Sequence, residues 1–112
     1  MNFFICILTR SSLQMIPKKF TAEYGSNLSN PVLLKSPDGI EWEMHWIKDD
    51  SGGVWFEEGW KEFSTYYSLR HGHVVVFKYR KTCSDLEVVH ILDGGSTCEI
   101  NYPSHNTQNE IR

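Results

Sequence analysis

The chain has 112 residues, which suits a single domain that buries roughly two-thirds of the surface its unfolded chain exposes. Its formal net charge of −3 argues against a protein that coats nucleic acid through bulk charge, and three cysteines without a CxxC spacing argue against a structural zinc site or a disulfide framework. The apolar start MNFFICIL is too short for a signal peptide, and no segment is long enough for a membrane span, so a soluble intracellular protein is expected.

The first part of the chain predicts a strand, a loop and a short helix. Phe3 to Leu8 is a continuous apolar run, which is typical of a buried strand. Thr9 to Ser12 interrupts this run with small polar residues and one arginine, so a loop is expected there. Pro17 suits the first position of a helix, and Lys18 to Tyr24 supplies about two turns. Gly25 is expected to end this helix as a C-terminal stop.

The middle of the chain predicts a β-hairpin followed by an acidic turn. Val32 to Leu34 is a short apolar strand, and Pro37-Asp38-Gly39 is a strong turn signal, because proline restricts φ and glycine tolerates a positive φ. Ile40 to Trp46 then alternates strictly between apolar and polar residues, which indicates a half-buried strand. Lys48 to Gly53 forms a second turn, which is expected to be flexible and acidic.

A second helix and a valine-rich strand organise the rest of the chain. Trp60, Phe63 and Tyr67 recur at the spacing of one apolar helix face, and Gly72 ends the segment. Val74 to Phe77 is a short run of mostly β-branched residues, which predicts a strand. A helix with rings on the face nearest such a strand is expected to plug an opening in a β-structure.

Three more short strands are predicted. Val54–Phe56 precedes the second helix, Leu86–Leu92 follows the valine-rich strand, and Thr97–Tyr102 lies near the end of the chain. The polar residues 104–112 are expected to form a disordered tail after a domain of residues 1–103. A total of about seven short strands and two short helices indicates a mainly β fold, an antiparallel barrel or sandwich.

Six motifs occur in a fixed order along the chain: FF at Phe3-Phe4, MIPKKF at Met15–Phe20, SPDGIEW at Ser36–Trp42, GWKEF at Gly59–Phe63, VVVFKY at Val74–Tyr79 and CEINYP at Cys98–Pro103. Together they resemble the plant B3 DNA-binding domain, in particular its reproductive-meristem branch. The resemblance implies a seven-stranded open antiparallel pseudobarrel with two short helices. It also implies a nuclear, non-enzymatic regulator of transcription that binds double-stranded DNA and pairs with other transcription-factor domains, without a cofactor, a membrane or a small-molecule substrate.

The resemblance also implies two loop arms that enter the major groove of DNA. The first arm corresponds to Thr9–Gln14, and the second to Lys48–Gly53. Arg10 is the main candidate, because arginine pairs with a guanine edge or with a phosphate. Lys18 and Lys19 are candidate phosphate contacts at the start of the neighbouring helix. The complete set of predicted DNA contacts is Thr9, Arg10, Ser11, Ser12, Gln14, Lys18, Lys19, Lys48 and Ser51.

Several departures from the family pattern favour weak binding of low sequence specificity. The first arm is short, and the second arm carries Asp49 and Asp50, whose carboxylates would repel phosphates unless they turn away or accept from a cytosine amino group. Residues 49–63 together hold five acidic residues against one lysine. The chain has Gly72-His73 where the family has Gly-Asp, so a turn carboxylate is missing and local loosening is expected.

Other kinds of function find less support in the sequence. His71 and His73 could be combined with His45 or His90, but no spacing supplies a convincing third ligand, so no metal is predicted. The chain has no GxSxG, no Gly-rich phosphate loop and no HExxH, which argues against an enzyme. The main alternative is a protein-interaction module on the same fold that has lost DNA binding, which an exposed aromatic patch would favour.

Overall fold

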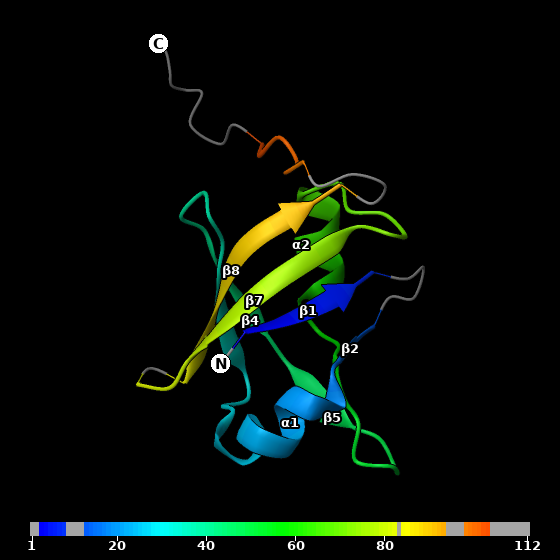
Figure 1. Ribbon diagram of the computed structural model, residues 1–112, viewed down its shortest axis with the longest axis vertical. Coiled ribbons are helices and arrows are strands. Elements are labelled where there is room, and N and C mark those ends of the chain that lie inside the picture. The colour runs from blue at the N-terminus through cyan, green and yellow to red at the C-terminus, as the bar shows by residue number, and fades with distance from the viewer. Residues whose placement is uncertain (1–2, 9–12, 83, 94–97, 104–112) are drawn as a thin grey trace.

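The described residues of this computed structural model, 3–8, 13–82, 84–93 and 98–103, form eight strands in two sheets together with two α-helices and one 3-10 turn (Figure 1). In neither sheet is the first strand hydrogen-bonded to the last, so both sheets are open. The predicted mainly β, open architecture is therefore confirmed, with eight strands in place of seven. Neither α-helix is long and apolar enough to cross a membrane.

The larger sheet has five strands in the order β1-β7-β8-β3-β4. All neighbouring strands are antiparallel except β3 and β8, which run parallel. The β3–β4 pair is the hairpin that the Pro37-Asp38-Gly39 turn predicts, with Gly39 at a φ of 91°. The five strands are β1 (Phe3–Ile7), β3 (Val32–Lys35), β4 (Glu41–Met44), β7 (Val74–Arg80) and β8 (Asp85–Leu92).

The smaller sheet corrects the prediction of one strand over Ile40–Trp46. The chain leaves the larger sheet at His45, whose N–H donates to the carbonyl of Glu58 at 2.9 Å and whose carbonyl accepts from Glu57 N at 2.8 Å. Strand β5 (Trp46–Lys48) then joins β2 (Gln14–Ile16) and β6 (Val54–Phe56) in the order β2-β6-β5. Alternation indicates which face a side chain occupies, but it carries no information on which backbone supplies the hydrogen bonds.

Strand β1 is buried on one face only, which corrects the expectation of a buried first strand. Phe4 and Cys6 point into the core, whereas Phe3, Ile5 and Ile7 are 42%, 56% and 63% exposed. The strand lies at the edge of the five-stranded sheet and pairs with β7 alone. A continuous apolar run predicts burial on both faces, but among the described residues no element covers the outer face of β1.

The two helices have the predicted locations. Helix α1 (Lys18–Tyr24) does not end in a left-handed glycine, because Gly25 has a φ of −60° and the chain continues into the 3-10 turn Gly25–Asn27. Helix α2 (Trp60–Tyr66) buries the predicted apolar face, and the exposed fraction of Trp60, Phe63 and Tyr67 does not exceed 3%. The ring-bearing face of α2 therefore closes one side of the β-structure, as its spacing predicts.

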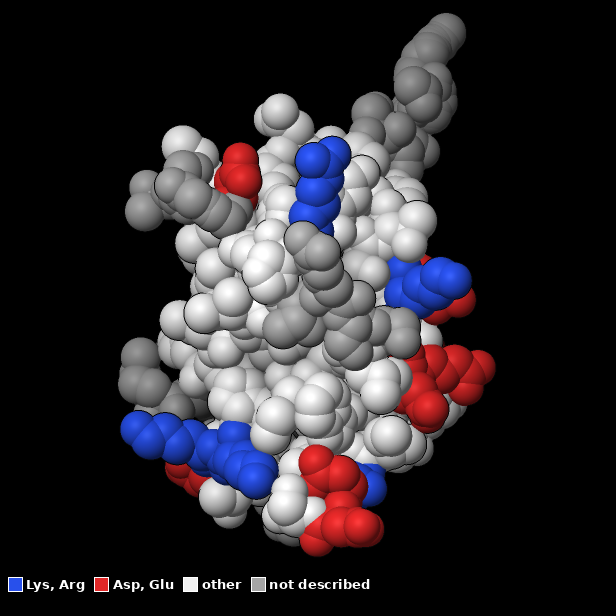
Figure 2. Space-filling model, turned by 90° about the vertical axis from the view of Figure 1, so that its right-hand side faces the viewer, with Lys and Arg blue, Asp and Glu red and all other residues white. Residues whose placement is uncertain are grey.

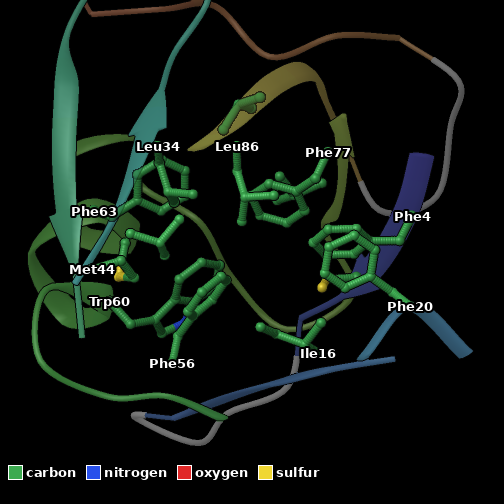
Figure 3. Packing of buried hydrophobic residues seen from close by; sticks show 14 of the residues in the cluster. Phe4, Ile16, Phe20, Leu34, Met44, Phe56, Trp60, Phe63, Phe77 and Leu86 are labelled. Carbon is green, nitrogen blue, oxygen red and sulfur yellow. The ribbon is translucent and has the colours of Figure 1, made fainter. Parts of the chain in front are cut away.

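Buried rings from both sheets and both helices form one hydrophobic core (Figure 3). Phe77 of β7 stacks on Phe4 of β1 with ring centroids 4.8 Å apart, and Phe4 contacts Phe20 of α1 at 4.3 Å. On the other side, Phe56 of β6 stacks on Trp60 of α2 at 5.6 Å. The Phe56 and Phe77 rings contact each other at 6.1 Å, so they join the two sheets.

The end of the chain differs from the predicted strand over Thr97–Tyr102. Its described residues, 98–103, form only one isolated bridge, between Glu99 and Leu92 of β8. The backbone N–H of Ile100 donates to the carbonyl of Ile91 at 3.0 Å, which holds this segment beside β8. The predicted tail, residues 104–112, lies outside the described residues.

Candidate nucleic-acid interface

The start of α1 and the turn between β5 and β6 meet at the surface. Lys18 Nζ donates a hydrogen bond to Ser51 Oγ at 3.3 Å, across 33 positions of sequence. A groove of about 380 Å³ lies at this junction, with Lys18 and Thr21 on one wall and Lys48 and Gly52 on the other. The structure therefore brings together three of the predicted DNA contacts, Lys18, Lys48 and Ser51.

The turn between β5 and β6 is organised by the Asp49 carboxylate. One carboxylate oxygen accepts from the N–H and hydroxyl of Ser51 at 2.9 and 2.8 Å and from Gly53 N at 2.8 Å, and the other accepts from Trp55 Nε1 at 2.9 Å. These hydrogen bonds to the charged form, with that from Trp55 the largest contribution, hold the pKa of Asp49 well below its usual range. The Asp49 carboxylate is thus hydrogen-bonded within its own turn, although Asp49, like Asp50, is exposed to solvent.

Asp49 is expected to make the stability of the domain fall at acidic pH. Its folded-state pKa is lowered, so its contribution is present above the pKa of an unfolded aspartate, about 4, and is lost as the pH falls below that value. Melting temperatures of wild type and Asp49→Asn should differ near about pH 7, and the difference should start to shrink below about pH 4 and disappear only when the folded-state carboxyl is protonated. Asp50→Asn, in the same turn, is the matched control, and a difference for Asp49→Asn that does not change with pH would contradict this role.

Lys19 lies on a different side of α1 from Lys18. It lines a second groove, of about 490 Å³, that runs between α1 and the exposed side of β1, together with Phe3, Ile5 and Glu23. Successive residues of a helix are separated by about 100° around its axis, which agrees with Lys18 and Lys19 lining different grooves. The two predicted phosphate contacts therefore belong to separate surfaces.

The other predicted contacts lie on or near the segment between β1 and β2. Thr9, Arg10, Ser11 and Ser12 lie outside the described residues. Gln14, which is expected on the first arm, belongs to β2 instead and is only 6% exposed, with its Nε2 donating to the Met15 carbonyl at 3.1 Å. The chain already pairs with β6 at this position, so Gln14 faces the protein and not a partner.

In the turn after α2, where local loosening is expected, an imidazole lies where the family pattern has a carboxylate. The Nδ1 atom of His73 lies 3.0 Å from the backbone N–H of Arg70 and accepts its hydrogen bond. The imidazole therefore takes the place of the carboxylate that the family pattern has at this position. Sequence reasoning missed this because histidine is not a common capping residue, and it also left Arg70 out of the predicted contacts.

On the face shown in Figure 2, the described Lys and Arg side chains do not form one continuous basic surface. Figure 2 shows the right-hand side of Figure 1, where Lys and Arg side chains lie in separate groups with Asp or Glu side chains between them. Such a distribution gives local attraction for phosphates without a strong overall field.

Comparisons with known proteins agree on one family. The family model described as the B3 DNA binding domain matches residues 3–95. The chain is 34% identical over 94 residues to the B3 domain-containing protein At4g01580 of Arabidopsis thaliana, which covers 84% of this chain and 47% of that protein. It is also 34% identical over 106 residues to the B3 domain-containing transcription factor VRN1 of the same plant, with 91% of this chain and 30% of that protein covered. The chain thus spans less than half the length of these two relatives.

A solved structure shows the same fold. The hypothetical Arabidopsis thaliana protein At1g16640.1 superposes with a TM-score of 0.68 over 86% of this chain and 93% of that chain, at 23% sequence identity. At this level of identity the likeness concerns the fold alone.

Proposed function

This chain belongs to the B3 DNA-binding domain family, and from that premise we propose that it binds double-stranded DNA as the DNA-binding domain of a nuclear, non-enzymatic regulator of transcription. The proposed interface consists of the first arm, with Arg10 as its main contact, and the groove between α1 and the β5–β6 turn. The two loop arms enter the major groove, and the lysines at their base contact phosphates.

The hydrogen bond between Lys18 and Ser51 is the observation that supports this interface most directly. It links α1, which follows the first arm in the sequence, to the β5–β6 turn, so a cation and a hydroxyl from distant segments lie together at the surface. The ammonium group of Lys18 has three donors, and one of them is used by Ser51, which leaves donors for a phosphate. Lys48 adds a second cation on the same groove.

The hydrogen bonds of the Asp49 carboxylate weaken one objection to this interface. A carboxylate on a DNA-contacting arm would repel phosphates, but Asp49 is engaged by hydrogen bonds from Ser51, Gly53 and Trp55 within its own turn. These donors stabilise the ionised carboxylate and fix its orientation within the turn, so its lone pairs are already occupied. Asp50 remains exposed on the same turn, and the basic groups are scattered, which supports modest affinity and low sequence specificity.

Duplex binding measured by fluorescence anisotropy over a range of salt concentrations tests the proposal. The wild type should bind at low salt, and the slope of log K against log salt should shrink by about 0.9 for each phosphate contact removed. We expect this loss for Lys18→Ala and for Lys48→Ala, and a loss of affinity for Arg10→Ala. Lys61→Ala, which removes an exposed lysine on α2, is the matched control and should leave the slope unchanged.

Two outcomes would count against this proposal. If the folded wild type did not bind duplex DNA at low salt, DNA binding itself would be wrong. If it bound but Lys18→Ala and Lys48→Ala behaved as Lys61→Ala does, the interface would lie elsewhere. Lys19→Ala, whose side chain faces the other groove, should have a smaller effect than Lys18→Ala.

The outer face of β1 supports a second candidate, a protein-interaction module. Phe3, Ile5 and Ile7 are exposed along an edge strand that contains no charged residue. An apolar edge strand is a ready site for pairing with another chain, and the groove of about 490 Å³ beside it is lined largely by apolar atoms. A folded domain that fails to bind DNA would make this surface the place to look for a protein partner.

A further inference from the structure

The turn between α2 and β7 holds an arginine beside the start of the first arm. The N–H of Leu8 donates to the His73 carbonyl at 2.8 Å, and Gly72 N donates to the Leu8 carbonyl at 2.9 Å. Leu8 is the last described residue before the Thr9–Ser12 segment, so this turn is attached to the base of the first arm. In Figure 1 it lies on the same right-hand side of the molecule as the β5–β6 turn.

The end of α2 directs the chain into this turn through a Schellman motif. Leu69 N donates to the Ser64 carbonyl at 2.8 Å, and Ser68 N donates to the Thr65 carbonyl at 3.1 Å. Ser68 occupies the left-handed position of the motif, with a φ of 55°. The helix therefore ends with a sharp reversal, and the residue that follows the motif is Arg70.

The backbone on both sides of Arg70 is held by hydrogen bonds. His73 N donates to the Arg70 carbonyl at 3.1 Å and closes a four-residue turn, in which Gly72 has a φ of 93° as the third residue of a type II turn requires. The His73 imidazole also accepts from Arg70 N at 3.0 Å. The direction of the Arg70 side chain is thus partly determined in the unbound protein, and His71 lies at the exposed apex of the turn.

A hollow of about 450 Å³ lies beside this turn and contains several hydrogen-bond donors. Among the described residues Arg70 forms no ion pair, in contrast to Arg80, which pairs with Asp85 at 3.4 Å. Asp93 is the one carboxylate among the described lining residues, which also include Arg70, His71 and His73.

We propose that the Arg70–His73 turn is an additional phosphate-binding element of the DNA interface, with Arg70 as its main donor and His71 as a secondary one. This inference rests on the proposed function. A guanidinium can bind a phosphate through two parallel hydrogen bonds. Because the backbone of Arg70 is already held by hydrogen bonds with His73, less conformational entropy is lost when the side chain binds. The turn is bonded to Leu8, which precedes the first arm in the sequence, whereas Lys18 follows that arm, so the two basic sites flank the arm along the chain. The contact is to the DNA backbone and is independent of sequence.

The test is anisotropy of the full chain with two duplexes of unrelated sequence, over the same salt series. Arg70→Ala should weaken binding equally on both duplexes and reduce the magnitude of the salt slope by about 1, while Arg70→Lys should retain most of the slope. Lys61→Ala removes the same charge at a distant position and should bind as the wild type does. Circular dichroism checks that each variant is folded, which is expected because Arg70 is exposed.

The outcomes separate this inference from the proposal on which it rests. If the wild type binds and Arg70→Ala has the slope of Lys61→Ala, the additional element is wrong and the DNA-binding proposal stands. If Arg70→Ala weakens one duplex and not the other, the contact is not to the backbone, and this inference is overturned. If the folded wild type binds neither duplex at low salt, both proposals are wrong.

Discussion

Replacement of Gly59 by alanine is expected to destabilise the domain by about 3 kcal/mol or more. Gly59 has a φ of 101°, a conformation that residues with a side chain rarely adopt. A β-carbon at this position would overlap the carbonyl oxygen of Glu43 in β4 and would lie 3.3 Å from the Sδ of Met44. Backbone strain and a clash with a strand of the larger sheet therefore add, because the helix α2 that follows cannot move away without exposing Trp60 and Phe63.

The matched control for this prediction is Gly39→Ala in the β3–β4 turn. Gly39 has a similar φ of 91°, but a β-carbon there would meet nothing within 4 Å. Alanine at position 39 should therefore cost only the backbone strain, about 1–2 kcal/mol. Urea denaturation gives both free energies of unfolding, and equal losses for the two variants would show that the approach of Glu43 does not restrict position 59.

Replacement of Phe77 by alanine is expected to lower the free energy of unfolding by about 3–5 kcal/mol. Its ring is fully buried, stacks on Phe4 at 4.8 Å and contacts Phe56 at 6.1 Å, so its removal leaves a cavity where the two sheets meet. A domain of this kind has a total stability of about 5–15 kcal/mol, so the loss is a large fraction of the whole. Phe77→Leu, which keeps most of the volume, should cost clearly less.

The control for the core prediction is Ile7→Ala on the neighbouring strand. Ile7 is 63% exposed, so the same kind of truncation should change stability by no more than about 0.5 kcal/mol. Chemical denaturation with fluorescence detection can follow all three variants. A small loss for Phe77→Ala, comparable to that for Ile7→Ala, would mean that the junction between the sheets can collapse around the missing ring.

The candidate site is predictable from the sequence only in part. The sequence predicts Lys18, Lys48 and Ser51 as separate contacts, and the structure brings them to one groove. The resemblance to the family places Gln14 on the first arm, but the residue belongs to β2 and is only 6% exposed. Arg70 is absent from the predicted contacts because nothing near it in the sequence indicates that its turn is bonded to Leu8.

Local patterns explain why much of the fold is predictable. The Trp60–Phe63–Tyr67 spacing, the Pro37-Asp38-Gly39 turn and the apolar run at Val74–Phe77 each depend on residues close in the chain. Helix periodicity and turn geometry require no knowledge of distant partners, so these elements appear where the sequence predicts them. The family motifs lie in the same short segments, so the resemblance to the family is also readable from local sequence.

The sequence alone therefore determined the mainly β class, the two helices, the β3–β4 hairpin and the family. The tertiary structure decided three other matters: the transfer of the chain between sheets at His45, the exposure of the outer face of β1, and the separation of Lys18 from Lys19 into different grooves. It also decided that the Asp49 carboxylate, in the β5–β6 turn, accepts hydrogen bonds from Gly53 and Trp55. Most of these features depend on hydrogen bonds and packing between elements far apart in the chain. Local periodicity reports only which face of an element is apolar, and it does not report which distant element covers that face.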